Sequence, residues 1–88
     1  MTKQQFDSLQ VGQLVRHKGG KLYKVVSITD DIGGRRVQQT TITSWDIGQA
    51  EGQPRRVSFQ QWQVNEKYPE GRYYQASKEF TADKVELA

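Results

Sequence analysis

The amino-acid sequence predicts an all-β protein, a small barrel or strongly bent antiparallel meander of five to six strands with a short N-terminal helical turn. Runs of β-branched and aromatic residues recur roughly every ten residues, and turn-forming residues cluster between them. The 88 residues suffice for one domain, residues 1–88, with a modest core. Only 34% of the residues are apolar, but two Trp, four Tyr and three Phe supply large areas to bury.

The N-terminal residues 2–10 predict a short helix of one turn or so. Thr2 occupies the N-cap position, and Gln5 follows it at the spacing of a capping box. Phe6 and Leu9 lie three residues apart and share one face of such a helix. The alternative is an irregular arm that places the same two side chains on the core.

Residues 12–29 predict a β-hairpin around which the rest of the chain is organised. Its turn, residues 17–20, contains two adjacent glycines, which tolerate positive φ at little steric cost and let the chain reverse. Side chains alternate between the two faces of a strand. The alternation in the second strand predicts that Val26 and Ile28 point into the core, with Leu22 beside them.

A second turn, residues 30–34, leads into a predicted third strand over residues 35–45. Neither face of this strand is strongly apolar, which predicts an edge strand or a surface that receives a ligand. Trp45 ends the strand and is expected to be exposed. Residues 46–54 contain two glycines, a proline and few apolar residues, and predict an exposed, mobile loop.

The next strand is predicted over residues 55–64, and its apolar alternation changes phase. Val57 and Phe59 share one phase, whereas Trp62 and Val64 share the other. A β-bulge or a short helical turn would absorb this change and bend the sheet. The predicted third strand begins with Arg35 and Arg36, and this strand begins with Arg55 and Arg56. If the two strands pair across the intervening loop, these arginines approach each other only in an offset register.

The C-terminal third predicts a turn over residues 65–71, a strand over residues 72–76 and a short last strand over residues 84–87. Between the two strands, residues 77–80 predict one helical turn that brings an aromatic side chain to the core. The aromatic residues expected to be buried are Phe59, Trp62 and Phe80.

The hairpin carries the pattern G-x-x-V-x-H-x-x-G-x-x-Y-x-V-V, and the residues of interest are Gly12, Val15, His17, Gly20, Leu22, Tyr23, Val25 and Val26. In this pattern the chain resembles the SH3-like small β-barrels, including KOW and Tudor-type domains. The resemblance covers about the first third of the chain and implies a small SH3-like barrel. A five-stranded OB-like barrel is the alternative fold.

The sequence offers little for catalysis or for metal and cofactor binding. It has a single histidine, His17, in a predicted turn, and no cysteine. The phosphate-binding and zinc-protease motifs are missing, and the aspartates of residues 30–34 lack the spacing of a calcium loop. We therefore expect no enzyme activity, no cofactor and no metal.

No apolar run is long enough for a signal peptide or a membrane span, and without cysteine the sequence gives no sign of an oxidising compartment. A cytoplasmic protein with no membrane partner is expected. The formal net charge is +3, and the excess of Lys and Arg lies in residues 1–36. Such asymmetry points weakly to a polyanionic partner. The candidate binding residues are Arg16, Lys18, Lys21, Lys24, Arg35, Arg36, Trp45, Arg55, Arg56, Tyr73 and Tyr74.

Two functions are compatible with this pattern. The first is a non-catalytic module that binds another protein, or a second copy of itself through an edge strand, as a small accessory factor. The second is a nucleic-acid-binding barrel with arginines and lysines on phosphates and aromatic rings on bases. Convergence of the basic side chains on one face would favour the second, and scattered cations with exposed apolar side chains the first. A small-molecule carrier ranks third, because side chains fill so small a barrel.

Overall fold

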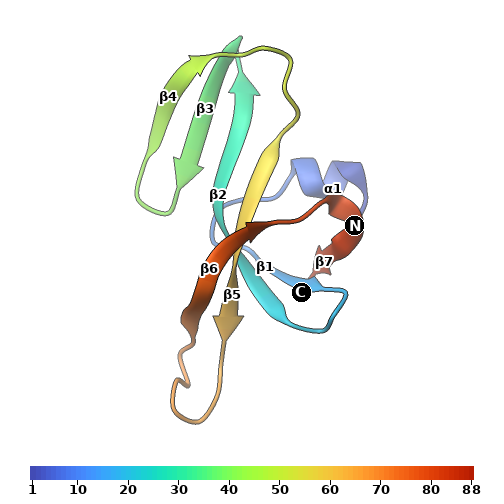
Figure 1. The fold of residues 1–88 in the computed structure, drawn as a ribbon, viewed down its shortest axis with the longest axis vertical. Coiled ribbons are helices and arrows are strands. Elements are labelled where there is room, and N and C mark those ends of the chain that lie inside the picture. The colour runs from blue at the N-terminus through green and yellow to red at the C-terminus, as the bar shows by residue number, and fades with distance from the viewer.

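The computed structural model describes residues 1–88 and is all-β, with 52% strand and 9% helix (Figure 1). The predicted fold class is confirmed, but seven strands form one antiparallel sheet that is not closed into a barrel. The longest helix has five residues, far too few to cross a membrane. The elements in chain order are α1 (Lys3–Asp7), β1 (Leu14–His17), β2 (Leu22–Ile32), β3 (Arg35–Thr40), β4 (Ser44–Gln49), β5 (Arg56–Gln63), β6 (Arg72–Glu79), the 3₁₀ turn η1 (Ala82–Lys84) and β7 (Val85–Leu87).

Strand β2, eleven residues long, is the centre of the sheet. Its first half pairs with β1 and its second half with β3 along one edge, while β5 runs along the other edge. Strand β1 pairs in turn with β7, and β5 with β6. The molecule is 45 Å long, and the β3–β4 and β5–β6 hairpins extend toward opposite ends of its long axis (Figure 1).

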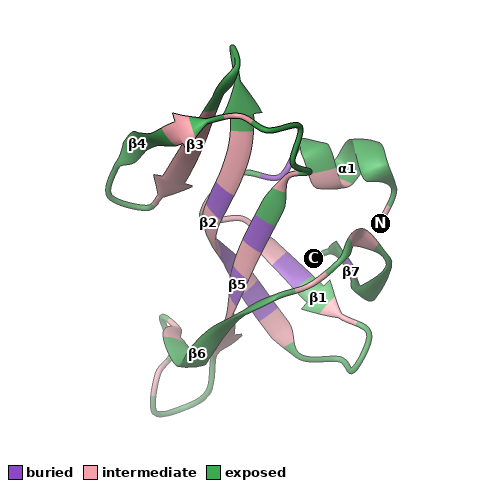
Figure 2. Ribbon diagram, turned by 45° about the horizontal axis from the view of Figure 1, so that its top comes forward, coloured by how far each residue is buried: buried purple, intermediate pink, exposed green.

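The core is small and lies where β1, β2, β5 and β7 meet (Figure 2). No residue of β3, β4 or β6 is buried, so the two hairpin ends add little to it. Met1, Phe6, Val11 and Phe80 pack against the core from outside. The buried residues are Leu9, Val15, Tyr23, Val25, Ile28, Val57, Phe59 and Val85.

A β-bulge at Val26 overturns part of the predicted alternation in β2. Val25 pairs with Phe59 and Ser27 with Ser58, so Val26 is an extra residue opposite β5. The bulge moves the inward phase of the strand by one residue. Ile28 is buried as predicted. Leu22 and Val26 were expected in the core but are only half-buried, and Tyr23 and Val25 are buried in their place.

The N-terminal helical turn is confirmed, including its capping box. The Gln5 amide donates to the Thr2 hydroxyl at 3.1 Å, and the Thr2 amide donates to the Gln5 side chain at 3.0 Å. Leu9 enters the core, and Phe6 packs on its rim. Helix α1 therefore covers one end of the sheet.

The third strand begins at Arg35 as predicted, but the prediction that it extends to residue 45 is wrong. The chain turns after Thr40, whose hydroxyl accepts hydrogen bonds from the amides of Ile42 and Thr43, both at 3.3 Å. Side-chain bonds of this kind compete with strand pairing. The end of the predicted strand and residues 46–49 of the predicted loop return as β4, so β3 pairs with β2 and β4 and not with β5.

The β5–β6 hairpin differs from the prediction in two further ways. Strand β5 has no extra residue, and the irregularity lies in β6. Gln75 of β6 has φ 65°, and residues 75–77 face the single residue Gln60 of β5. Trp62 consequently points to the face opposite Phe59 and is half-buried, not buried as expected. Residues 77–79 belong to β6 and form no helical turn; the turn, η1, comes later. Phe80 packs against the core from outside and is half-buried, not buried as expected.

Candidate functional site

The one histidine has a structural environment. Nδ1 of His17 accepts a hydrogen bond from the Gly19 amide at 3.0 Å, and the ring packs on Phe80 with centroids 4.6 Å apart. These contacts shape the β1–β2 turn. No three His, Cys, Asp or Glu side chains lie close enough together to hold a metal ion.

A polar groove of about 450 Å³ crosses the outer face of the sheet, away from the core. Ser27, Thr29 and Ser58 alternate along their strands with the buried Ile28 and Val57, so core packing directs these hydroxyl side chains outward. The groove spans β2, β3 and β5 and reaches β4 and β6 at its sides. Its lining residues are Ser27, Thr29, Arg36, Gln38, Ile47, Arg56, Ser58, Ser77, Lys78 and Glu79.

The charges of the polar groove are three cations and one anion. Nε and Nη2 of Arg56 donate to the two carboxylate oxygens of Glu79 at 2.9 and 3.0 Å. These hydrogen bonds, and the charge of Arg56, hold the pKa of Glu79 below its ordinary value. Arg36 has neither an ion pair nor a side-chain hydrogen bond, so it is an unpaired cation of the groove. Lys78 is unpaired as well, but it is the cross-strand partner of the buried Phe59, so its side chain leaves β6 toward the core face.

An aromatic pair continues the same face toward the end of the β5–β6 hairpin. Trp62 and Tyr73 are cross-strand partners with ring centroids 5.0 Å apart at 74°. Nζ of Lys24 lies 3.6 Å from the Trp62 ring centroid, and Gly71 packs so closely on the indole that a Cβ there would overlap it. Trp62 is thus enclosed by its neighbours, whereas Tyr73 is exposed.

The β3–β4 hairpin displays large apolar side chains outside the core. Ile42 at its turn is 92% exposed, and Trp45 and Ile47 on β4 are exposed as well. Trp45 was expected to be exposed, and this is confirmed. Strand β4 has no partner on its outer side, so the edge strand predicted at residues 35–45 lies instead at residues 44–49.

Arg35 and Asp46 fasten the two strands of this hairpin together. Nε of Arg35 donates to Asp46 at 2.8 Å, and the Gly48 amide donates to the same carboxylate at 2.8 Å across an irregularity in β4. The hydrogen bond from Arg35, followed by that from Gly48, lowers the pKa of Asp46. Arg35 therefore lies in a structural ion pair, away from the polar groove.

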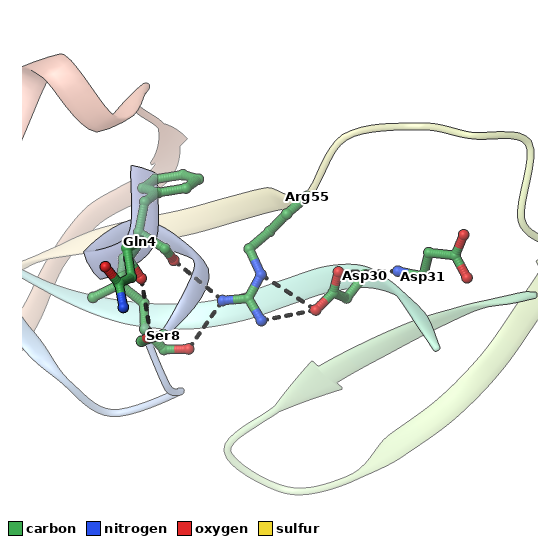
Figure 3. Close-up of polar contacts among 7 residues, drawn as sticks. Gln4, Ser8, Asp30, Asp31 and Arg55 are labelled. Carbon is green, nitrogen blue, oxygen red and sulfur yellow. Dashed lines mark hydrogen bonds and ion pairs between the residues drawn. The ribbon is translucent and has the colours of Figure 1, made fainter. Parts of the chain in front are cut away.

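Arg55 also has a structural environment, between α1 and β2 (Figure 3). Its Nη2 donates to Asp30 at 2.7 Å, and its Nη1 donates to the main-chain carbonyls of Phe6 and Leu9 at 3.2 and 3.1 Å. The Arg55 side chain is only 15% exposed. We call this set of contacts the Arg55 clamp, because it ties the N-terminal helix to the sheet.

The remaining candidate residues lie apart from the polar groove. Arg16, Lys18 and Lys21 surround the β1–β2 turn, where Nη1 of Arg16 donates to the Gly20 carbonyl at 2.9 Å. Tyr74 follows Tyr73 on β6 and therefore points to the opposite face of the sheet. The structure brings four candidate residues to the outer face of the sheet: Lys24, Arg36, Arg56 and Tyr73. Trp45 lies at the border of this face as the cross-strand partner of Gln38. The other candidate residues lie elsewhere on the surface.

Among the lining residues of the polar groove, the sequence analysis named only Arg36 and Arg56. Ile42 was placed inside the predicted third strand and Ile47 in the predicted loop, because the end of β3 was predicted wrongly. The threonines around Ile42 could have indicated the turn. Lys78 was assigned to a helical turn, and Trp62 to the core. Comparison of the chain with protein-family models, with curated proteins and with solved structures found no match.

Proposed function

We propose that the protein is a non-catalytic binding module that contacts another protein through its β3–β4 hairpin. The observation that carries the proposal is the exposure of Ile42, Trp45 and Ile47 on a hairpin that contributes no buried residue. Side chains that serve the core of their own protein would not be displayed in this way. The scatter of the basic side chains favours this function over nucleic-acid binding as the principal one.

The three apolar side chains provide enough surface for specific recognition. Burial of one large apolar side chain contributes about 1.5–3 kcal/mol, and tryptophan is enriched among the residues that dominate interface energetics. Trp45 lies on β4 between the hairpin turn and Ile47. A partner that covers this strand would therefore bury an aromatic anchor flanked by two aliphatic side chains.

Two further expectations belong to this proposal. Pairing of β1 with both β2 and β7 supports an SH3-like arrangement, because it joins the start and the end of a short-strand meander. The open edge of β4 supports contact with an extended segment of a partner or with a second copy of the chain. The bulge in β4 and the charge of Asp46 are features that discourage uncontrolled edge pairing.

Site-specific photo-crosslinking in living cells tests the proposal. A benzophenone amino acid at position 42 is compared with the same group at position 64, since Val64 is also an exposed aliphatic residue but lies by the other hairpin. We expect a discrete protein adduct from position 42 that the additional change Trp45→Ala abolishes. An adduct of twice the chain mass would identify a second copy as the partner. No adduct, or the same adducts from both positions, would contradict the proposal.

A further inference from the structure

Arg36 is the most informative cation of the polar groove. Its side chain is half-buried on β3, and no carboxylate lies within ion-pair distance, although Asp31 is its cross-strand neighbour on β2. The Asp31 carboxylate instead accepts a hydrogen bond from the Gly34 amide at 3.1 Å. A partly desolvated guanidinium with five donors and no acceptor is suited to a phosphate or carboxylate ligand.

The neutral residues of the groove point to a ligand with many acceptor oxygens. The side chains of Ser27, Thr29, Ser58 and Ser77 line the groove and make no hydrogen bond within the protein. Gln38, beside Arg36 on the same face of β3, is also without a side-chain partner. Hydroxyl and amide donors of this kind commonly contact phosphate and sugar oxygens.

The aromatic residues extend this face beyond the groove. On β5, Arg56, Ser58, Gln60 and Trp62 alternate on the outer face, and at ~3.3 Å per residue they span roughly 20 Å. Lys24 adds a positive charge above Trp62, and Tyr73 presents an exposed ring beside it. A cationic groove next to a stacking ring is the arrangement with which proteins bind single strands of nucleic acid.

We propose that the polar groove binds single-stranded nucleic acid, with backbone phosphates on Arg36 and Lys24 and a base stacked on Tyr73. This activity differs from the protein contact of the β3–β4 hairpin, and the two surfaces adjoin at Ile47. A single strand fits better than a duplex, because these cations lie on a sheet face and not on a projecting helix or ribbon that could enter a groove of the duplex. Arg56 contributes less, since Glu79 already neutralises its charge.

The two phosphate contacts fix the expected salt dependence. For single strands the slope of log affinity against log salt is about −0.7 per phosphate neutralised, which gives about −1.4 for two contacts. A rise from 50 to 200 mM salt should then weaken binding roughly sevenfold. Replacement of one contacting cation should reduce the slope by about 0.7 and weaken binding by on the order of tenfold.

Fluorescence anisotropy of a labelled mixed-sequence 12-nucleotide DNA strand, with the matching RNA strand and DNA duplex, tests the proposal. Arg36→Gln is compared with Arg16→Gln, which removes the same charge at the β1–β2 turn outside the groove. Circular dichroism establishes that both variants are folded. We expect saturable binding of a single strand with the stated salt slope, weakened by R36Q and not by R16Q. Tyr73→Leu should weaken binding with the salt slope unchanged.

Four results would overturn the proposal. They are absence of binding to either single strand, equal weakening by R36Q and R16Q, tighter binding of the duplex, and displacement of the strand by a polyglutamate peptide of equal charge. The last result would assign the groove to acidic protein segments. None of these outcomes depends on crosslinking from position 42, so the groove and the β3–β4 hairpin are tested independently.

Discussion

Replacement of Arg55 by methionine should destabilise the protein far more than the same replacement of Arg35. Both arginines donate two hydrogen bonds to an aspartate, but Arg35 and its partner Asp46 are 54% and 48% exposed, against 15% and 27% for Arg55 and Asp30. Methionine keeps most of the apolar stem and removes the charge and the donors. The pair of variants therefore compares an exposed ion pair with a part-buried one that has two further hydrogen bonds to main-chain carbonyls.

The size of the effect follows from the contacts of the Arg55 clamp. Arg55→Met removes the donors to Asp30 and to the Phe6 and Leu9 carbonyls and leaves a part-buried carboxylate without a partner. Hydrogen bonds to charged groups contribute about 1.5–3 kcal/mol each when buried and are not additive, so partial hydration leaves a total of about 2–3 kcal/mol. A chain of this length unfolds at a cost of roughly 4–13 kcal/mol. Loss of the clamp should thus remove a large share of the stability.

Urea denaturation followed by tryptophan fluorescence measures the difference. We expect a clearly lower midpoint for R55M and little change for R35M, because exposed ion pairs contribute little. A double-mutant cycle of R55M with Asp30→Asn should give a coupling energy of about 1–2 kcal/mol. If R55M is too unstable to purify, Arg55→Lys takes its place. Lysine keeps the positive charge but loses the planar set of guanidinium donors. Equal midpoints for R55M and R35M would refute the reasoning.

Three further outcomes follow from the structure. Gly71→Ala should lower the urea midpoint and shift tryptophan emission to longer wavelength, because a Cβ at φ +87° would displace the Trp62 indole; unchanged emission would contradict this packing. Thermal melts should show a modest loss of stability as the pH falls from about 5 to 3. The pKa values of Asp46 and Glu79 are lowered in the folded state, so these two carboxylates stabilise the fold at neutral pH and cease to do so when they are protonated. A flat profile would oppose this. Ile42→Ser should leave the melting temperature unchanged, and a drop would mean that the hairpin turn packs more than its exposure indicates.

Features that depend on neighbouring residues could be predicted from the sequence. The capping box of Thr2 and Gln5 and the turn at residues 17–20 are local, and both are present. Burial of Ile28 and Phe59 was predicted from large apolar side chains within strands, although the bulge at Val26 breaks the alternation on which the prediction for Ile28 rested. The all-β class required only the spacing of such segments.

Features that depend on distant pairing could not be predicted. The bulge at Val26 is defined only by the register of β2 against β5, about thirty residues along the chain. Arg55 meets carbonyls 46 and 49 residues away in the sequence, and nothing near it distinguishes it from the exposed Arg56. For the candidate site, the exposure of Trp45 was predictable from its polar strand, whereas the meeting of Arg36 and Arg56 in one groove was not.

The double use of β2 has a consequence for how this protein can change in evolution. Tyr23, Val25 and Ile28 of β2 anchor the core, while residues 27–32 carry β3 and, through it, the exposed β4. Ile28 is the one buried residue of β2 that pairs with β3, opposite Gln39, so most substitutions in the β3–β4 hairpin should cost little stability. Partner preference could diversify there quickly among descendants of this chain, while selection for folding holds β1, β2, β5 and β7 nearly constant.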